Sequence, residues 1–558
     1  MSLDILAFSL LAWVTLELLF FGIVMLMLVP RMNRLQPPCE YPIDNKKLTY
    51  KILETVDWLS AQGDAETTFE SFLSGWFLGA KCSELGRGNL VEFLAFSMFA
   101  KESSALSEQE QNDVAEVVTT TEERLGYKFR PGYNEQVRCI RHTLDPVVPF
   151  SHRPLVLYAF LWLVRVIVGV ALNLAGYRRR RAPCGRFSYW YRQFRHRHNQ
   201  QQLQHPHGGS VSASASTLPG PIVLFHGVGA GLPFYVLAIW KLCRGRTSVI
   251  IESPSIMMSL ALLRGHRPPS ESQLVESVEG IMERHSLRKA AFFGHSFGSI
   301  AVAWMARLKP DLVSQIVLLD PVCLLLFLPR VARSFLHPDT NGLPLHEKLM
   351  LFFVTKEMGI SHTLRRHSWW YANILWPEDV KCPIVVGLAG EDRIVPSKPL
   401  RRYLRAHRSF ATSSSSPHGV NMDCVEGLIH CGGGCANGRA TGRGGCDNDQ
   451  HSVGKKHLVQ GLIPSISELR ATKAHGGQGT AAVSGSSSIN GNGEFFSIAI
   501  GEDVVEDSVE SDDGADGLAR RVELVYWPDA VHGEALARPS AMDEFVRVAA
   551  RQEQAFST

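Results

Sequence analysis

The stretch 290-AAFFGHSFGSIAVAWMARL-308 carries the clearest structural signal in this sequence. Its first residues form a short apolar run, and a helical pattern starts at Ser299. Between the two stands Gly294-His295-Ser296-Phe297-Gly298, which fits the pattern G-x-S-x-G. This order predicts a buried strand, a sharp turn and a helix, with the Ser296 hydroxyl presented at the turn. A serine that serves only as a helix cap is the alternative.

Short apolar runs on both sides of this stretch indicate further strands. They are IVLFH (222–226), SVIIES (248–253), QIVLLD (315–320), PIVVGLAG (383–390) and VELVYW (522–527). Uninterrupted runs of this kind are typical of parallel strands that are buried on both faces. We therefore predict the α/β class, with a mostly parallel sheet and helices on both of its faces. The mainly helical, aromatic segment 321–381 predicts a cap between two of the strands.

Length and composition set broad limits. The chain has 558 residues, more than one hydrophobic core usually organises. Its formal net charge of +3 gives no general attraction for nucleic acid, so we expect no nucleic-acid partner. The 11 cysteines lack the dense spacing of a disulfide scaffold, and they predict mostly free thiols in a reducing compartment.

The N-terminal residues predict a membrane anchor, which we place at residues 1–30. Residues 5–29 are almost wholly apolar and would form a helix of about 37 Å, longer than a bilayer core of about 30 Å. Arg31 and Arg34 follow this segment, which favours a cytosolic continuation. A cleaved signal peptide is the alternative, but the apolar run is too long for one. Glu17 lies mid-span and needs a proton or a partner.

A second apolar segment, 154–177, has Arg165 at its centre and Arg178 to Arg181 behind it. A full crossing would put these arginines on the outer side, against the usual preference for cytosolic basic residues. We expect instead an in-plane or re-entrant helix, with Arg165 reaching to the interface and the arginine run on anionic headgroups. A buried helix of the globular body is the alternative.

The other segments complete the expected order of domains. Residues 31–153 predict a soluble, helix-rich region, and residues 178–219 a basic, low-complexity linker. The α/β core is expected at 220–409 and again at 520–558. Between these parts, residues 410–519 are rich in Gly, Ser and acidic residues and predict a disordered insertion.

From Pro221 to Ser540 the chain resembles the α/β-hydrolase superfamily. In that family a His-Gly turn after an early core strand supplies part of the oxyanion hole, and FHGVGAG (225–231) is similar to it. The resemblance implies that Ser296 is the nucleophile. It also implies that the backbone N–H groups of Val228 and Phe297 stabilise the oxyanion. A glycine-rich turn shaped only for packing is the alternative for this loop.

The family places its acid after the strand that follows the cap, and its histidine after the final strand. GLAGEDRIVPS (387–397) therefore makes Asp392 the expected acid, while Glu391 and Asp320 stay open as alternatives. His532, in the segment VELVYWPDAVHGEAL, has the position of the base, with a surface histidine as the alternative.

Two further groups of residues could bind ligands. Cys431 and Cys435, with Cys424, Cys446 and His430, could form a zinc cluster, but their spacing fits no standard finger and favours free thiols. In the cap, the aromatic residues could line an acyl pocket or meet lipid, although packing is the simpler role; they are Trp369, Trp370, Tyr371 and Trp376. We expect neither a metal nor a cofactor.

These features together predict a membrane-bound serine hydrolase that cleaves a lipid or other hydrophobic ester through an acyl-enzyme. The alternatives are acyl transfer to an alcohol by the same residues, and a catalytically silent scaffold. The expected location is an internal membrane with the hydrolase domain on the cytosolic side. The sequence does not indicate protein partners.

Overall fold

The computed structural model describes residues 3–37, 44–63, 67–147, 152–194, 219–338, 342, 345–406 and 521–556. The predicted insertion at 410–519 and most of the predicted linker lie outside the described residues, as does the possible zinc cluster of Cys424, His430, Cys431, Cys435 and Cys446.

An eight-stranded sheet forms the centre of the protein, in the order β1-β2-β4-β3-β5-β6-β7-β8. The strands are β1 (Arg178–Arg181), β2 (Ser188–Arg192), β3 (Ile222–Phe225), β4 (Ser248–Glu252), β5 (Ala290–His295), β6 (Val313–Leu319), β7 (Ile384–Ala389) and β8 (Val522–Trp527). All neighbouring pairs from β4 to β8 are parallel, whereas β2 runs antiparallel to both β1 and β4. The predicted α/β class with a mostly parallel sheet is confirmed.

The first two strands correct the predicted linker. Arg178 to Arg181 pair with β2 and form the edge of the sheet, with all four side chains exposed. The Arg179 guanidinium lies 2.8 Å from the carboxylate of Glu252 on β4. Four adjacent charges show no apolar alternation, so the sequence pattern concealed this strand. The same charges discourage another chain from pairing with the edge.

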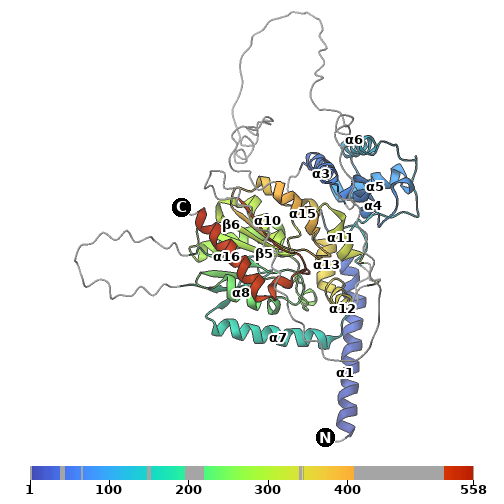
Figure 1. Cartoon of the computed structure of the whole chain (residues 1–558). Coiled ribbons are helices and arrows are strands. Elements are labelled where there is room, and N and C mark those ends of the chain that lie inside the picture. Colours follow the sequence, from blue (N-terminus) through green and yellow to red (C-terminus); the bar gives the residue numbers. More distant parts are fainter. Residues whose placement is uncertain are drawn as a thin grey trace, which may run out of the picture. The chain divides into compact units, whose positions relative to one another are not determined.

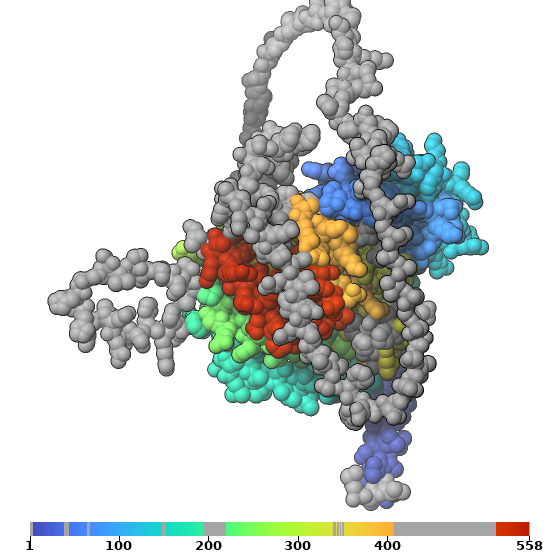
Figure 2. Space-filling model, viewed as in Figure 1, coloured from blue at the N-terminus to red at the C-terminus, as the bar shows by residue number. Residues whose placement is uncertain are grey.

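Helices cover both faces of the sheet, as predicted. One face carries α9 (Glu271–Arg284), α10 (Gly298–Leu308) and α15 (Ser397–Ala406), and the other carries α8 (Val236–Leu242) and α16 (Pro539–Ala555). Figure 1 shows α8 and α16 in front of the sheet, and Figure 2 shows the C-terminal segment with α16, in red, at the surface in the same view. Successive residues alternate between the two cores, since Phe292 packs into one and Phe293 into the other. Both are fully buried.

The cap and the N-terminal helical region pack together. The cap consists of α11 (Pro329–Leu336), α12 (Leu345–Val354), α13 (Met358–Arg366) and α14 (Trp370–Asn373). The N-terminal region consists of α3 (Asn45–Ala61), α4 (Phe69–Trp76), α5 (Arg87–Phe99) and α6 (Glu108–Leu125). The Trp76 indole donates to the carbonyl of Phe327 (3.0 Å), and the Trp370 indole donates to the carbonyl of Ser97 (3.1 Å). The N-terminal region therefore extends the cap instead of forming a separate body.

Two helices are long and apolar enough to cross a membrane: Asp4–Met32, which comprises α1 (Leu3–Ile23), a π-helical turn and α2 (Val29–Met32), and α7 (Leu155–Leu174). The predicted need of Glu17 for a partner is met by the backbone N–H of Leu155, at 2.9 and 3.0 Å from its two carboxylate oxygens. Length and composition make these helices candidates for membrane contact.

The surroundings of α7 change the prediction for Arg165. Its guanidinium donates to the carbonyl of Met258 (2.9 Å) on the sheet body, so it does not reach out to the interface. A fully buried helix is also wrong, because many of its apolar side chains are exposed. These are Val156, Phe160, Trp162, Leu163, Val166, Ile167, Val170 and Leu174.

Candidate active site

Ser296 lies at the turn between β5 and α10, as the sequence predicts. Its φ of +51° falls in the left-handed region, which costs a non-glycine residue about 1–3 kcal/mol and persists where the surrounding structure enforces it. A Cβ on Gly298 would collide with the backbone carbonyl of Phe225, and one on Gly294 would lie 2.8 Å from the carbonyl oxygen of Gly298. The two glycines are therefore needed for close approach of strand and helix.

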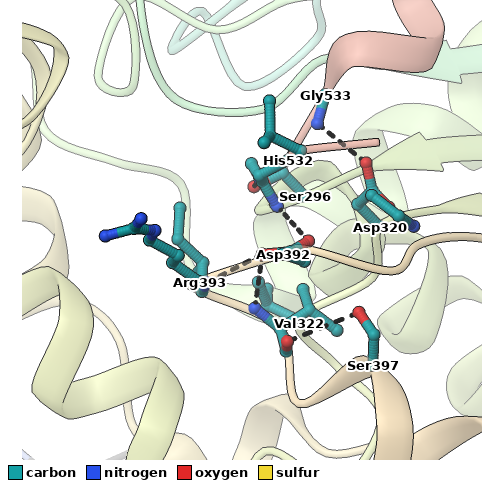
Figure 3. Close-up of polar contacts among 12 residues, drawn as sticks. Ser296, Asp320, Val322, Asp392, Arg393, Ser397, His532 and Gly533 are labelled. Atoms are coloured by element: carbon teal, nitrogen blue, oxygen red, sulfur yellow. Dashed lines mark hydrogen bonds and ion pairs between the residues drawn. The ribbon is translucent and has the colours of Figure 1, made fainter. Parts of the chain in front are cut away.

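The structure brings Ser296, His532 and Asp392 together (Figure 3). The His532 Nε2 atom lies 2.9 Å from the Ser296 Oγ, and its Nδ1 lies 2.7 Å from the Asp392 Oδ2. The other carboxylate oxygen of Asp392 accepts the N–H groups of Ile394 (2.7 Å) and Val395 (2.9 Å). These two bonds orient the carboxylate, and the carboxylate in turn orients the imidazole.

The two alternative acids have other positions. Glu391 is exposed, and no hydrogen bond joins it to the His532 ring among the described residues. Asp320 is completely buried at the end of β6 and accepts the N–H groups of Ala389 (2.8 Å) and Gly533 (2.8 Å). Figure 3 shows the Asp320 bond to Gly533, the residue after the histidine. Asp320 thus supports the histidine loop, while Asp392 is the partner of the ring.

Burial and neighbouring charges shift the pKa values of His532 and Asp320. Burial alone lowers the pKa of His532, but the Asp392 carboxylate, through its charge and hydrogen bond, and Asp320 raise this pKa to about 9. Burial, together with the nearby Asp392, raises the pKa of Asp320 to about 6, against the opposing effects of His532 and of the two backbone N–H groups.

Asp320, Asp392 and His532 also form a group of potential metal ligands, with one ligand atom from each lying within 4.8 Å of the others. The hydrogen bonds described above already use both carboxylates and both ring nitrogens of His532. One of those nitrogens, Nε2, contacts the Ser296 hydroxyl, and this arrangement suits proton transfer.

The two residues predicted to donate to the oxyanion line the same cavity as Ser296. Val228 and Phe297 line the cavity that contains Ser296. The Val228 loop is fixed by the preceding residue, because the Gly227 N–H donates to the Tyr235 hydroxyl (2.6 Å). That hydroxyl also lies 2.6 Å from Nδ1 of the buried His295. A hydrogen-bonded chain thus connects the Val228 loop to the nucleophile turn.

Sequence analysis missed Tyr235 and the role of His295. The signal available was weak: His295 occupies a variable position of G-x-S-x-G, and Tyr235 stands in an apolar stretch after the glycine loop. Their pairing becomes visible only when β3 and β5 lie side by side.

The cavity beside Ser296 is mainly apolar. Its cap wall contains Val331, Phe335, Leu364 and Trp370, and its floor contains Ile300 and Val322. Trp76 and His142, from the N-terminal helical region, also line it. Of the aromatic cap residues singled out in the sequence, Trp370 lines the cavity, while Tyr371 and Trp376 are buried in packing. The shape and chemistry of the cavity suit a hydrophobic group.

The described cysteines agree with the expectation of free thiols. Cys82, Cys139, Cys184, Cys243, Cys323 and Cys382 are all unpaired. Burial is the largest influence on Cys323 and raises its pKa to about 12, so this thiol remains protonated and inert near neutral pH.

Comparisons with known proteins agree with this architecture. A family model described as alpha/beta hydrolase fold matches residues 262–354, which contain the nucleophile turn. The abhydrolase domain-containing protein abhd-5.2 of Caenorhabditis elegans is 31% identical over 102 residues, 18% of this chain and 23% of the relative. The 1-acylglycerol-3-phosphate O-acyltransferase ABHD5 of Sus scrofa is 31% identical over 108 residues, 18% of this chain and 29% of the relative. The matches thus span less than a third of these relatives.

Solved structures with some similarity include two enzymes. A bacterial membrane phospholipase A has 17% sequence identity and a TM-score of 0.28, over 44% of this chain and 82% of that one. A 2-hydroxy-6-oxo-6-phenylhexa-2,4-dienoate hydrolase from Rhodococcus sp. strain RHA1 has the same identity and TM-score, over 41% of this chain and 87% of that one.

Proposed function

We propose that the chain is a member of the α/β-hydrolase superfamily and that it hydrolyses a carboxylic ester through an acyl-enzyme on Ser296. The observation that carries this proposal is the position of His532, whose two ring nitrogens lie 2.9 Å from Ser296 Oγ and 2.7 Å from Asp392 Oδ2. A nucleophile, a base and an orienting acid are the three groups that this chemistry requires.

The reaction follows from these contacts. Nε2 of His532 removes the proton of the Ser296 hydroxyl while Oγ attacks the carbonyl carbon of the ester. The carbonyl oxygen becomes negative, and the N–H groups of Val228 and Phe297 are the donors that we assign to it. Collapse of this intermediate breaks the bond to the alcohol, which leaves with the proton from His532. Water then attacks the acyl-enzyme by the same route, and the acid is released.

The substrate class follows from the surface around the site. The cavity is mainly apolar, and two long apolar helices belong to the same compact unit of the chain. These features support a lipid or another hydrophobic ester. We place the protein on an internal membrane, with residues 1–30 as the anchor and the hydrolase domain on the cytosolic side, since Arg31 and Arg34 follow the apolar helix.

Acyl transfer is the second candidate, supported by the similarity to a protein named as an O-acyltransferase. The same acyl-enzyme forms in both reactions, and only the attacking group differs. A silent scaffold is less well supported, because it gains nothing from a strained serine in contact with an oriented imidazole.

A fluorophosphonate probe tests the nucleophile. We expect covalent labelling of the full-length protein and none of Ser296→Ala, while the surface variant Ser272→Ala labels like the wild type. Unchanged labelling of Ser296→Ala would remove the proposed nucleophile. Lipids that accumulate in cells carrying Ser296→Ala then identify the substrate, and product analysis with added alcohol acceptors separates hydrolysis from transfer.

A further inference from the structure

A hollow of about 330 Å³, whose lining does not include Ser296, lies between the end of the first apolar helix, the loop after Leu262 and α13. Its walls are rich in basic and imidazole side chains: Arg31, Arg34, His266, Arg267, His362 and His367. None of the residues that line it is acidic. A concave surface with one sign of charge concentrates ions of the opposite sign.

The arginines of this hollow are available for a ligand. Arg31, Arg34 and Arg267 are exposed, and no ion pair joins any of them to a carboxylate within the described residues. Guanidinium groups present N–H donors in a planar fork that matches phosphate oxygens. Three such groups from two separate segments therefore converge on one space without an internal counter-ion.

Two histidines add buried donors. His362 is 6% exposed and makes no hydrogen bond to any described residue, and its ring centre lies 5.0 Å from that of His367. Nε2 of His367 is buried and also lacks a partner in the described chain. Burial, followed by the charges of nearby arginines, lowers the pKa of His362 to about 4. Buried polar atoms usually have partners, so the unpaired Nε2 of His367 fits a site that receives a ligand.

The hollow is firmly built and lies at the end of a helix of membrane-spanning length. Leu28 and Met32 are buried in one apolar cluster with Met358 of α13, and Leu262 packs against the same cluster. This packing joins the two walls that carry the arginines. The helix Asp4–Met32 ends here, at the level where lipid headgroups would lie if the helix crosses a bilayer.

We propose that this hollow binds a phosphate group, carried either by an anionic lipid at the membrane surface or by a soluble phosphate ester. Its basis is geometry and charge in a hollow whose lining does not include Ser296. It holds whether or not the protein hydrolyses esters.

The test measures binding without turnover. Full-length protein in neutral detergent micelles is titrated with phosphatidic acid, with phosphatidylcholine of the same acyl chains, and with glycerol 3-phosphate. The variant Arg34→Gln/Arg267→Gln removes two of the donors. Arg264→Gln is the matched control, because Arg264 is exposed on the same loop but does not line the hollow. Thermal unfolding midpoints show whether each variant is folded.

We expect phosphatidic acid to bind and the double variant to weaken its affinity about tenfold, the effect of losing about 1.4 kcal/mol of charged hydrogen bonding. Arg264→Gln should bind phosphatidic acid with the affinity of the wild type. Any binding of phosphatidylcholine should not depend on Arg34 or Arg267. If glycerol 3-phosphate binds with the same dependence on Arg34 and Arg267, the phosphate site stands and its source is soluble. Absence of binding by both phosphates would overturn the proposal. An equal loss of affinity in Arg264→Gln would also overturn the proposal, because the effect would then come from the general positive charge and not from a defined site.

Discussion

The carboxyl edge of the sheet and the N-terminal helical region contribute to the same cavity in different ways. The sheet edge supplies Ser296, Asp392 and His532 from turns that directly follow β5, β7 and β8. The helical region supplies Trp76 and His142, which belong to no recognisable motif. Both sets are buried or nearly so, yet only the first is visible in the sequence.

Under the proposed function, this difference separates the residues assigned to the reaction from those assigned to substrate selection. Proton transfer needs a few specific groups in strict geometry, so the sequence carries a motif for each of them. A hydrophobic wall needs only volume and apolar surface, and many side chains can supply these. We therefore expect changes at the sheet edge to abolish turnover, and changes in the helical region to alter stability and substrate preference.

The largest effect should come from the sheet edge. Asp392→Asn keeps the shape but removes the charge that orients and stabilises the imidazolium, which should lower the rate of ester cleavage about 10⁴-fold. Glu391→Gln, at the exposed neighbour, should change the rate little. Initial rates on a soluble ester provide the measurement. Equal losses in the two variants would mean that the acid has been misassigned.

A smaller effect is expected in the helical region. Trp76 is 3% exposed and packs against the cap, so Trp76→Ala should lower the free energy of unfolding by about 3–5 kcal/mol. Trp76→Phe keeps most of the volume and loses the 3.0 Å hydrogen bond to Phe327, a cost of about 1 kcal/mol. Denaturant titration measures both. A folded Trp76→Ala protein with unchanged preference among acyl chain lengths would contradict the assigned role of this wall.

The pH dependence distinguishes the two buried carboxylates. Only neutral His532 can accept the serine proton, and its pKa is raised to about 9, so the rate of Ser296 labelling should increase with pH up to that value. The Asp320 charge contributes to the increase in this pKa. Removing the charge in Asp320→Asn lowers the pKa of His532, and the rising limb should move to lower pH. A profile that keeps its position would show that Asp320 does not act on the histidine.

The smallest effect should come from β1, the outermost strand on one side of the sheet. Arg179 is half exposed, and its ion pair with Glu252 is solvated on one side. Arg179→Gln should therefore change the free energy of unfolding by less than about 1 kcal/mol, measured by denaturant titration. A loss of several kcal/mol would mean that the arginines of β1 stabilise the fold, in addition to discouraging another chain from pairing with this edge.

Much of the centre of the protein was predictable. Strands buried on both faces are apolar along most of their length, so β3 to β7 stand out as runs, and the turn at Ser296 needs its glycines for close approach. The edge strand β1 escaped prediction because an exposed edge imposes no apolar pattern. The choice of Asp392 over Asp320 was open for another reason, since both follow a strand at the same edge.

What the sequence by itself determined is the set of candidate reacting groups and their order along the chain, because each is tied to a local turn with its own residue requirements. The tertiary structure decided which groups meet. His532 reaches Ser296 across 236 positions, Tyr235 connects the glycine loop to His295, and Trp76 closes the cavity from a region without a motif. These contacts arise from the packing of distant elements, and packing is specified by volume and shape, which no short pattern records.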